Sequence, residues 1–333
     1  MMKSLIQELV ETTSPSGYET KVRDLIRLRV EPLADEVQVD ALGNLIATKG
    51  QIKTGGKKIM LAAHMDEIGI IATHIDDSGF VRFTPLGGVR RQTCIGGRVR
   101  FLDGTQGVIS YEELDDIYKL PTFNQMYIDV GASSRGDCPV RVGDVAAFDR
   151  TFSAYSERLV SKAMDDRIGV AVLIETLRLL KRTPNQVFFV FSVQEEVGLR
   201  GATTAAYGLD PDVGIAVDVT RSGDTPKGIK MDVSLGSGPA VKVRDSGMLS
   251  DPRIVNWMVD TAEKAQIPYQ LEVLEAGTTD ARAIQLTRAG VPAGCISIPC
   301  RYVHAPSEMV DYNDVQNAVQ LLLALIKQKV NLD

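Results

Sequence analysis

The segment Lys57-Lys58-Ile59-Met60-Leu61-Ala62-Ala63-His64-Met65-Asp66 joins an unbroken apolar run to two polar side chains. A short, continuously apolar run is typical of a strand that is buried on both faces of a parallel sheet. The run ends at His64, and Asp66 follows two positions later. Because side chains two residues apart in an extended chain point to the same side, Asp66 can orient the His64 ring. The segment therefore predicts a buried strand that ends in a histidine–carboxylate pair.

Further apolar strands alternate with amphipathic helices along most of the chain. Apolar runs at 187–193, 214–217 and 294–298 predict strands, and the 36–39 segment alternates with period two. Apolar residues at helical spacing predict helices over 170–177 and 315–322, and Ser250-Asp251-Pro252 predicts the start of another. Near the N-terminus, Ser14-Pro15-Ser16-Gly17 predicts a turn in which Ser16 caps a helix through Leu28. The alternation predicts an α/β fold, a three-layer sandwich with a largely parallel sheet.

Residues 67–158 show a different pattern of apolar residues. Short alternating runs at 68–75, 80–85, 98–102, 107–111, 126–130 and 144–148 are separated by turn signals, and no helical period is present. Evenly spaced short strands predict a small all-β barrel. We therefore expect an inserted β-barrel domain at 67–158 and a discontinuous α/β domain formed by residues 1–66 and 159–333.

Composition excludes several classes of protein. The 333 residues include 37 lysines and arginines against 43 aspartates and glutamates, a net charge of −6, so nucleic acid is not an expected partner. No window reaches the roughly 18 apolar residues of a membrane helix, and the first residues lack a secretory signal. The four cysteines form no CxxC pair, which argues against a disulfide scaffold or a structural zinc site. We expect a cytoplasmic protein with no membrane partner.

Polar residues follow the ends of the predicted strands, where open α/β sheets bind their ligands. Each has a simple structural explanation when it is taken alone: a helix cap for Asp165-Asp166, a solvated loop for Glu195-Glu196, and an exposed loop for His304. Two of the three histidines nevertheless lie at this edge, and only His74 does not. Histidine and carboxylate without cysteine suit zinc, cobalt or manganese. Five ligands can hold two ions if one carboxylate bridges them, as in two-metal hydrolases. The candidates at this edge are His64 with Asp66, the pairs Asp165-Asp166 and Glu195-Glu196, Asp218 and His304.

Five motifs together resemble the glutamyl or tetrahedral (TET) aminopeptidase family, metallopeptidase family 42, from about residue 5 to residue 325. They are Ala63-His64-Met65-Asp66-Glu67-Ile68-Gly69, Ala163-Met164-Asp165-Asp166-Arg167, Glu195-Glu196-Val197-Gly198, Asp218-Val219-Thr220 and Arg301-Tyr302-Val303-His304-Ala305-Pro306-Ser307-Glu308-Met309. The resemblance implies two divalent metal ions per subunit, zinc or cobalt or else manganese.

The resemblance also implies a role for each motif residue. His64 and Asp218 would bind one ion, Glu196 and His304 the other, and Asp165 would bridge the two from a cis peptide to Asp166. Glu195 would be the general base, and Asp66 would support His64. The inserted barrel would mediate dimerisation, and dimers would build homododecamers that act on short peptides with a free N-terminus.

One further assignment and two alternative functions accompany this interpretation. Thr278, Thr279 and Asp280 are candidate substrate-binding residues, although Gly277-Thr278-Thr279 also suits a turn that caps a helix. A glycoside hydrolase needs two carboxylates that flank the scissile bond, and neighbours such as Glu195 and Glu196 do not obviously supply that pair. A catalytically silent peptide-binding relative would have lost a ligand or the base, and neither is lost. A dehydrogenase is excluded, since no GxGxxG follows an early strand.

Overall fold

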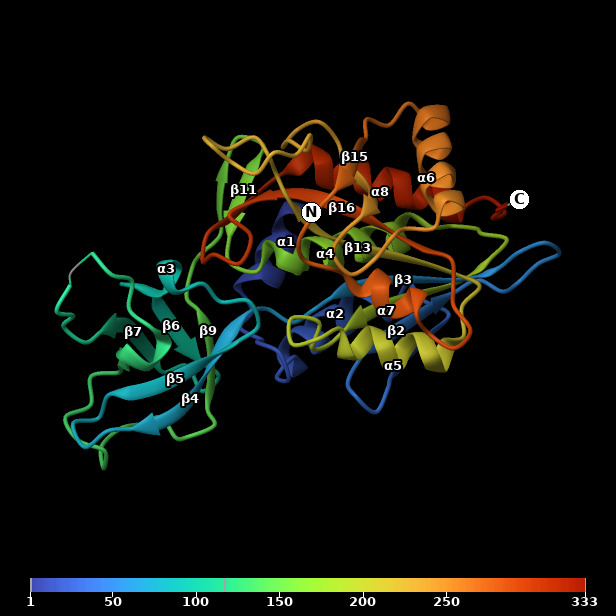
Figure 1. The fold of residues 1–333 in the computed structure, drawn as a ribbon. Helices are drawn as coiled ribbons and strands as arrows, with labels where there is room; N and C mark the ends of the chain where they lie inside the picture. The colour runs from blue at the N-terminus through green and yellow to red at the C-terminus, as the bar shows by residue number, and fades with distance from the viewer. Residues whose placement is uncertain (1, 117, 333) are drawn as a thin grey trace.

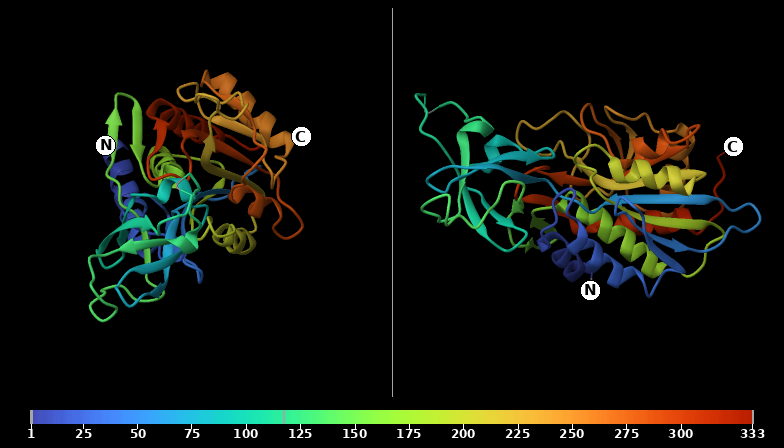
Figure 2. Two further views of the ribbon diagram at one scale, coloured as in Figure 1. Left: turned by 60° about the vertical axis from the view of Figure 1, so that its left-hand side comes forward. Right: turned by 90° about the horizontal axis from the view of Figure 1, so that it is seen from below.

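The computed structural model describes residues 2–116 and 118–332. An α/β unit with a largely parallel sheet carries a closed β-barrel at one end, which confirms the predicted fold class (Figure 1). The molecule is elongated, and the barrel protrudes from the α/β unit in all views (Figure 2). Within the described ranges, no helix is long and apolar enough to cross a membrane.

The sheet of the α/β unit is parallel at its centre and antiparallel at both edges. The central strands are β12 (Gln186–Ser192), β3 (Lys58–His64), β13 (Val213–Arg221) and β16 (Ala293–Arg301), in that order. One edge adds β2 (Leu45–Lys49) and β1 (Glu36–Val39), and the other adds β17 (Glu308–Asp311), β11 (Arg158–Ser161) and β10 (Ser153–Tyr155). Strand β14 (Ala240–Arg244) pairs antiparallel with β16, and β15 (Gln270–Val273) pairs parallel with β14.

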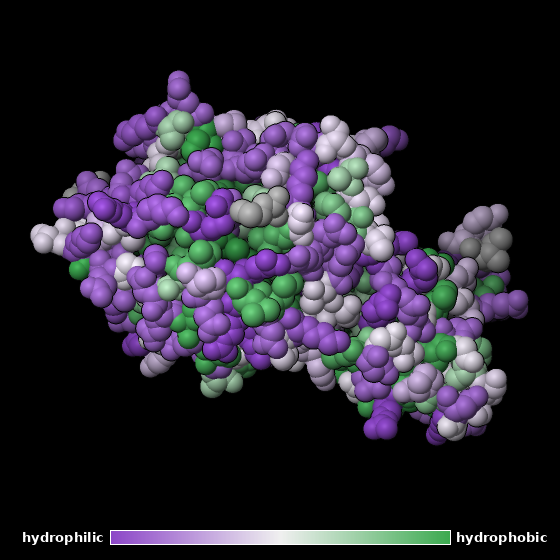
Figure 3. All heavy atoms as spheres, turned by 180° about the vertical axis from the view of Figure 1, so that it is seen from behind, coloured by the Kyte–Doolittle hydropathy of each residue, from purple (hydrophilic) through white to green (hydrophobic). Residues whose placement is uncertain are grey.

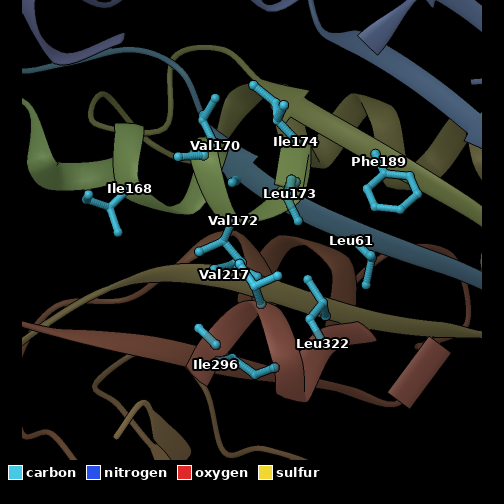
Figure 4. Packing of buried hydrophobic residues seen from close by; sticks show 14 of the residues in the cluster. Leu61, Ile168, Val170, Val172, Leu173, Ile174, Phe189, Val217, Ile296 and Leu322 are labelled. Carbon is cyan, nitrogen blue, oxygen red and sulfur yellow. The ribbon is translucent and has the colours of Figure 1, made fainter. Parts of the chain in front are cut away.

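Helices cover both faces of this sheet because its strands are apolar on both sides. In β3, Leu61 belongs to the large core under α1 (Met2–Glu11), α2 (Thr20–Val30), α4 (Met164–Leu179), α6 (Pro252–Ala265) and α8 (Tyr312–Ile326). The next residue, Ala62, belongs to a smaller core under α5 (Arg200–Leu209) and α7 (Asp280–Gln285). Figure 4 shows side chains of α4 and α8 packed with Leu61, Phe189 and Val217 of the strands. Alternate burial along the strands therefore produces three layers.

The barrel consists of six short antiparallel strands. These are β4 (Gly69–Ile75), β5 (Val81–Leu86), β8 (Met126–Asp129), β7 (Gln106–Tyr111), β6 (Arg98–Phe101) and β9 (Val145–Phe148), in the order of the closed ring. Its own core includes Phe83, Ile109 and Phe148. A one-turn helix, α3 (Arg91–Cys94), and a 3₁₀ turn (Phe123–Gln125) interrupt the strands. The domain boundaries at residues 67 and 158 remain a prediction. Strand β10 lies within the range assigned to the inserted domain, but it pairs with β11 of the large sheet.

One prediction about the N-terminal segment is wrong. Helix α2 begins at Thr20, with Glu19 at its N-cap position, and Ser16 does not cap it. The backbone around Ser16 instead pairs with Glu67, because Pro15 forms a bridge to Glu67 and the Ser16 N–H donates to the Glu67 carbonyl. The Ser16 hydroxyl is thereby directed to Asp66, where Oγ donates to Oδ2 at 2.6 Å. The predicted start of a helix at Ser250-Asp251-Pro252 is confirmed, since Asp251 caps α6 ahead of Pro252.

The outer surface is mostly hydrophilic, as Figure 3 shows for the face seen from behind, and apolar side chains gather there only in small groups.

Candidate metal centre

A cavity of about 320 Å³ lies at the carboxyl ends of β3 and β13. Strand β3 pairs with β13 only as far as Ala62, whereas β13 pairs with β16 as far as Arg221, so the sheet opens before His64. The Asp166 carboxylate fills part of this gap and accepts the His64 N–H at 3.2 Å. Ligand-binding crevices of open α/β sheets arise in the same way. The structure thus forms a site at the predicted sheet edge.

The five predicted metal ligands lie together around this cavity. Asp165 is at their centre: Oδ1 lies 3.0 Å from His64 Nε2, and Oδ2 lies 3.3 Å from His304 Nε2. Glu196 Oε1 also lies 3.3 Å from His304 Nε2, and Asp218 Oδ1 lies 4.0 Å from His64 Nε2. Asp165 therefore presents one oxygen to each histidine, although 139 sequence positions separate it from His304. A cis peptide bond joins Asp165 to Asp166.

Two overlapping groups of ligand atoms, both of which include His64, are each close enough together to be a candidate site for an ion. One group is His64, Asp165 and Glu196, and the other is His64, Asp166 and Asp218; within each group the atoms lie within 4.8 Å of one another. Asp166 was not among the predicted ligands. Its two oxygens already accept the N–H groups of His64 and Gly169. These two hydrogen bonds explain the position of Asp166 without a bound metal ion.

The charges around the cavity fit bound cations. Burial raises the pKa of Asp218 and of Glu195 well above the usual range of carboxyl groups, and it also raises that of Glu196. Burial opposes the charge on His64, but the nearby carboxylates, Glu195 first, outweigh it and raise the pKa of the imidazole well above its usual value. The buried Oε1 of Glu196 accepts no hydrogen bond within the described part of the chain. Crowded, buried carboxylates with a free oxygen are what an oxygen- and nitrogen-ligated divalent ion requires.

Asp66 supports both the histidine and the loop that carries the two glutamates. Its Oδ1 lies 3.5 Å from His64 Nδ1 and accepts the Glu195 N–H at 3.0 Å. Its Oδ2 accepts the Ser16 hydroxyl and, at 3.3 Å, the Glu196 N–H. Burial raises the pKa of Asp66, but the bond to His64 and the charge of His64 outweigh burial, so the net shift is downward. Asp66 therefore lies behind His64, as the resemblance implies.

Glu195 lies within reach of the same centre. Its Oε2 is 3.9 Å from His64 Nε2, and the residue lines the cavity beside Glu196. The two neighbouring glutamates are directed differently, since the carboxylate of Glu196 lies against His304 and that of Glu195 lies toward His64.

The predicted substrate-binding residues occupy different positions. Thr279 lines the cavity, and its hydroxyl also accepts the Ala281 N–H as the N-cap of α7, so the capping explanation holds as well. Asp280 lies behind the cavity wall, where it accepts a hydrogen bond from the Ser192 hydroxyl. Burial raises the pKa of Asp280 to about 6. Its other oxygen, Oδ1, has no hydrogen-bond partner among the described residues.

Glu308 and Gly88 take part in the site, and neither was predicted. Glu308 Oε2 accepts the Asp165 N–H at 3.0 Å, and Oε1 accepts the His304 N–H at 2.7 Å. Burial, followed by the charge of Asp165, raises the pKa of Glu308 to about 8. Gly88 belongs to the barrel, and a Cβ there would lie 2.2 Å from His304 Nδ1. The barrel therefore forms the wall behind one histidine.

A buried ion network lies directly next to these residues. Lys162 Nζ donates to both oxygens of Glu67, at 2.8 and 2.6 Å, and Arg167 Nη2 lies 3.5 Å from Glu67 Oε1. The guanidinium of Arg167 also donates to the carbonyls of Leu9, Thr12 and Ser14. This network ties together the chain that enters the barrel, the connection from β11 to α4 and the N-terminal segment.

Comparisons with known proteins identify the family of the chain. A family model described as M42 glutamyl aminopeptidase matches residues 43–321. The chain is 37% identical over 344 residues to the lysyl aminopeptidase of Pyrococcus furiosus, covering 99% of this chain and 98% of that protein. The solved structure of aminopeptidase APDkam598 from Desulfurococcus kamchatkensis has a TM-score of 0.94 at 43% identity, covering 98% of this chain and 94% of that one. The TET1 peptidase of Pyrococcus horikoshii, described as able to assemble into a tetrahedron or a large octahedral shell, has a TM-score of 0.90 at 31% identity, covering 98% of this chain and all of that one. The chain therefore belongs to the M42 glutamyl aminopeptidase family.

Proposed function

We propose that the protein is a two-metal aminopeptidase that removes N-terminal residues from short peptides. The observation that carries this proposal is the Asp165 carboxylate, whose two oxygens lie 3.0 and 3.3 Å from the two histidines. One divalent ion would be held by His64 and Asp218, the other by Glu196 and His304, with Asp165 shared between them. Two such ions would lower the pKa of a water molecule toward neutrality and polarise the scissile carbonyl.

The chain's own residues would complete the chemistry. Glu195 would accept a proton from the attacking water and return it to the leaving amine, which requires a carboxyl pKa raised toward neutral pH. Burial raises the pKa of Glu195 in that direction. Asp66 would hold the His64 ring in place through its contact at Nδ1. Thr279 lines the cavity and would contact the substrate there, and Asp280 would support that wall from behind.

The proposal also covers the oligomeric state, the metal and the cellular location of the enzyme. Relatives of the TET type suggest a homo-oligomer, and we propose dimers that build a dodecamer, with the barrel at the dimer contact. The ligand set suits zinc or cobalt, with manganese as a further candidate. The four cysteines are free thiols, which is in keeping with a cytoplasmic, reducing location.

The test replaces the base and leaves the ligands in place. Glu195→Gln should abolish hydrolysis of unblocked aminoacyl-p-nitroanilides while the metal content measured by mass spectrometry stays near two ions per chain. Glu157→Gln, at an exposed site that pairs with Lys3, is the matched control and should keep full activity. Parental activity in Glu195→Gln would show that the base is another group.

Two substrate controls define the reaction class. An N-acetylated peptide should resist cleavage, since an exopeptidase of this kind needs a free amine, and rapid cleavage of it would indicate an endopeptidase or a deacylase. Carboxymethylcellulose should not be hydrolysed with any of the three metals; its hydrolysis would favour the glycoside hydrolase interpretation.

A further inference from the structure

A second cavity, of about 310 Å³, adjoins the metal centre. Arg221 and Val303 line both cavities, so the two are direct neighbours. Four cationic side chains, Arg90, Arg221, Lys227 and Arg301, line the second cavity, and no carboxylate is among its lining residues. We refer to it as the basic cavity.

Most of the positive charge in the basic cavity has no counter-ion. Arg301 is neutralised by Asp224, which accepts from Nε at 3.0 Å and from Nη2 at 2.7 Å. In residues 2–116 and 118–332, by contrast, no carboxylate lies within ion-pair distance of Arg90, Arg221 or Lys227. Burial lowers the pKa of the Arg90 guanidinium and the positive charge of Arg221 nearby lowers it further, whereas the Glu308 carboxyl group acts in the opposite direction without reversing the shift. Like charges held close together without a partner favour the binding of an anion between them.

The basic cavity lies within the length of a short peptide of the metal centre. Arg221 ends strand β13, three residues after Asp218, which is about 10 Å along a strand. Val303 directly precedes His304, and Arg90 follows Gly88 on the barrel. An extended dipeptide or tripeptide spans about 7–10 Å. A peptide of that size with its amino end at the metal centre would therefore bring its other end to the arginines.

On the assumption that the proposed function is correct, we propose that the basic cavity binds a carboxylate on the part of the peptide beyond the scissile bond. Two sources share this chemistry: the C-terminal carboxylate of a dipeptide or tripeptide, and an acidic side chain next to the bond that is cut. Arginine suits either source, because its planar fork donates two parallel hydrogen bonds to one carboxylate. The enzyme would then favour short peptides with free carboxyl ends over long or amidated ones.

The experiment compares substrates that differ only in a carboxylate. One pair is Ala-Ala-Ala and its C-terminal amide; the other pair is Ala-Asp-amide and Ala-Asn-amide. Alanine p-nitroanilide, which has no carboxylate, measures basal activity. We expect the wild-type protein to cleave at least one carboxylate-bearing member about tenfold more efficiently, by kcat/KM, than its neutral partner. A preference in the first pair only identifies the C-terminus as the source, and a preference in the second pair identifies the side chain.

Variants locate the effect in the basic cavity. Arg90→Gln should remove most of the carboxylate preference and change alanine p-nitroanilide hydrolysis less than about twofold. Arg91→Gln is the matched control, because Arg91 donates to the Pro121 carbonyl and does not line the basic cavity. Lys227→Ala, at an exposed position, should weaken the preference without affecting folding.

The outcomes distinguish failure of this proposal from failure of the proposed aminopeptidase function. Equal kcat/KM for both members of both pairs in the wild-type protein overturns the proposal, whatever the variants do. A wild-type preference that survives both Arg90→Gln and Lys227→Ala overturns it too. If Arg90→Gln also loses p-nitroanilide activity through misfolding, the Lys227→Ala ratio decides. Failure of the wild-type protein to hydrolyse any unblocked substrate with any metal would instead refute the aminopeptidase function itself.

Discussion

Replacing Glu67 with glutamine should destabilise the protein strongly, because two buried cations depend on its charge. The exposed fractions of the Glu67, Lys162 and Arg167 side chains are 2%, 4% and 0%. Glutamine has nearly the same size but no charge, so Lys162 and Arg167 would be left buried without a counter-ion. Removing one partner of a buried pair in this way costs about 3–5 kcal/mol. The free energy of unfolding should fall by that amount.

Urea unfolding of the metal-loaded protein measures this loss, at one protein concentration and one metal concentration because both shift the midpoint. Glu157→Gln removes the same charge from an exposed pair with Lys3, whose side chains are 48% and 38% exposed, and should cost about 0–1 kcal/mol. Lys162→Met should cost less than Glu67→Gln, because Glu67 then keeps Arg167 as a partner. A loss in Glu67→Gln no larger than in the control would refute the claim that this buried charge balances the two cations.

Four further predictions concern the metal centre. Asp165→Asn should lower the occupancy of both ions, since the shared carboxylate is lost, and unchanged stoichiometry by mass spectrometry would contradict the bridge. Gly88→Ala should push His304 aside and reduce metal content toward one ion per chain, with activity falling at least tenfold, whereas two retained ions would show that the ring can shift freely. Ser16→Ala should weaken metal affinity about tenfold through Asp66, measured by competition with a chelator; equal affinity would mean the hydroxyl has no such role. Metal removal should lower the melting temperature, and adding zinc should restore it; a melting temperature independent of metal would argue against a structural contribution from the ions.

The periodic and positional signals in the sequence were sufficient for the architecture. The unbroken apolar run before His64 predicted a central parallel strand, and the evenly spaced short strands predicted the barrel; the structure has both. The candidate ligands could be grouped because the carboxyl ends of parallel strands meet at one edge of the sheet. These signals are local or follow from a general rule of sheet topology.

Residues whose roles depend on tertiary contacts could not be found in this way. Ser16 matches the pattern of a helix cap, and only the bridge between Pro15 and Glu67 shows that its hydroxyl serves Asp66 instead. Gly88 lies in a segment of the barrel with nothing in its neighbours to indicate His304, which is more than 200 positions away. Glu308 belongs to the motif that contains His304. Its hydrogen bonds to the backbone N–H groups of Asp165 and His304 nevertheless depend on how the loop folds.

The link between Glu67 and Lys162 has a consequence for how such a protein can vary. The chain enters the barrel directly after Glu67, and Lys162 directly follows β11, the strand of the large sheet that comes after the barrel; their side chains are bonded to each other. The entry to the barrel is therefore fixed to the large sheet by a buried ion pair, and we expect the barrel's outer loops to tolerate changes in length and sequence without disturbing this attachment. The segment around Gly87 and Gly88 is different, because a Cβ at either position would meet Glu196 or His304. Natural variation and engineered grafts should accordingly be tolerated better in the barrel's outer loops than in this segment.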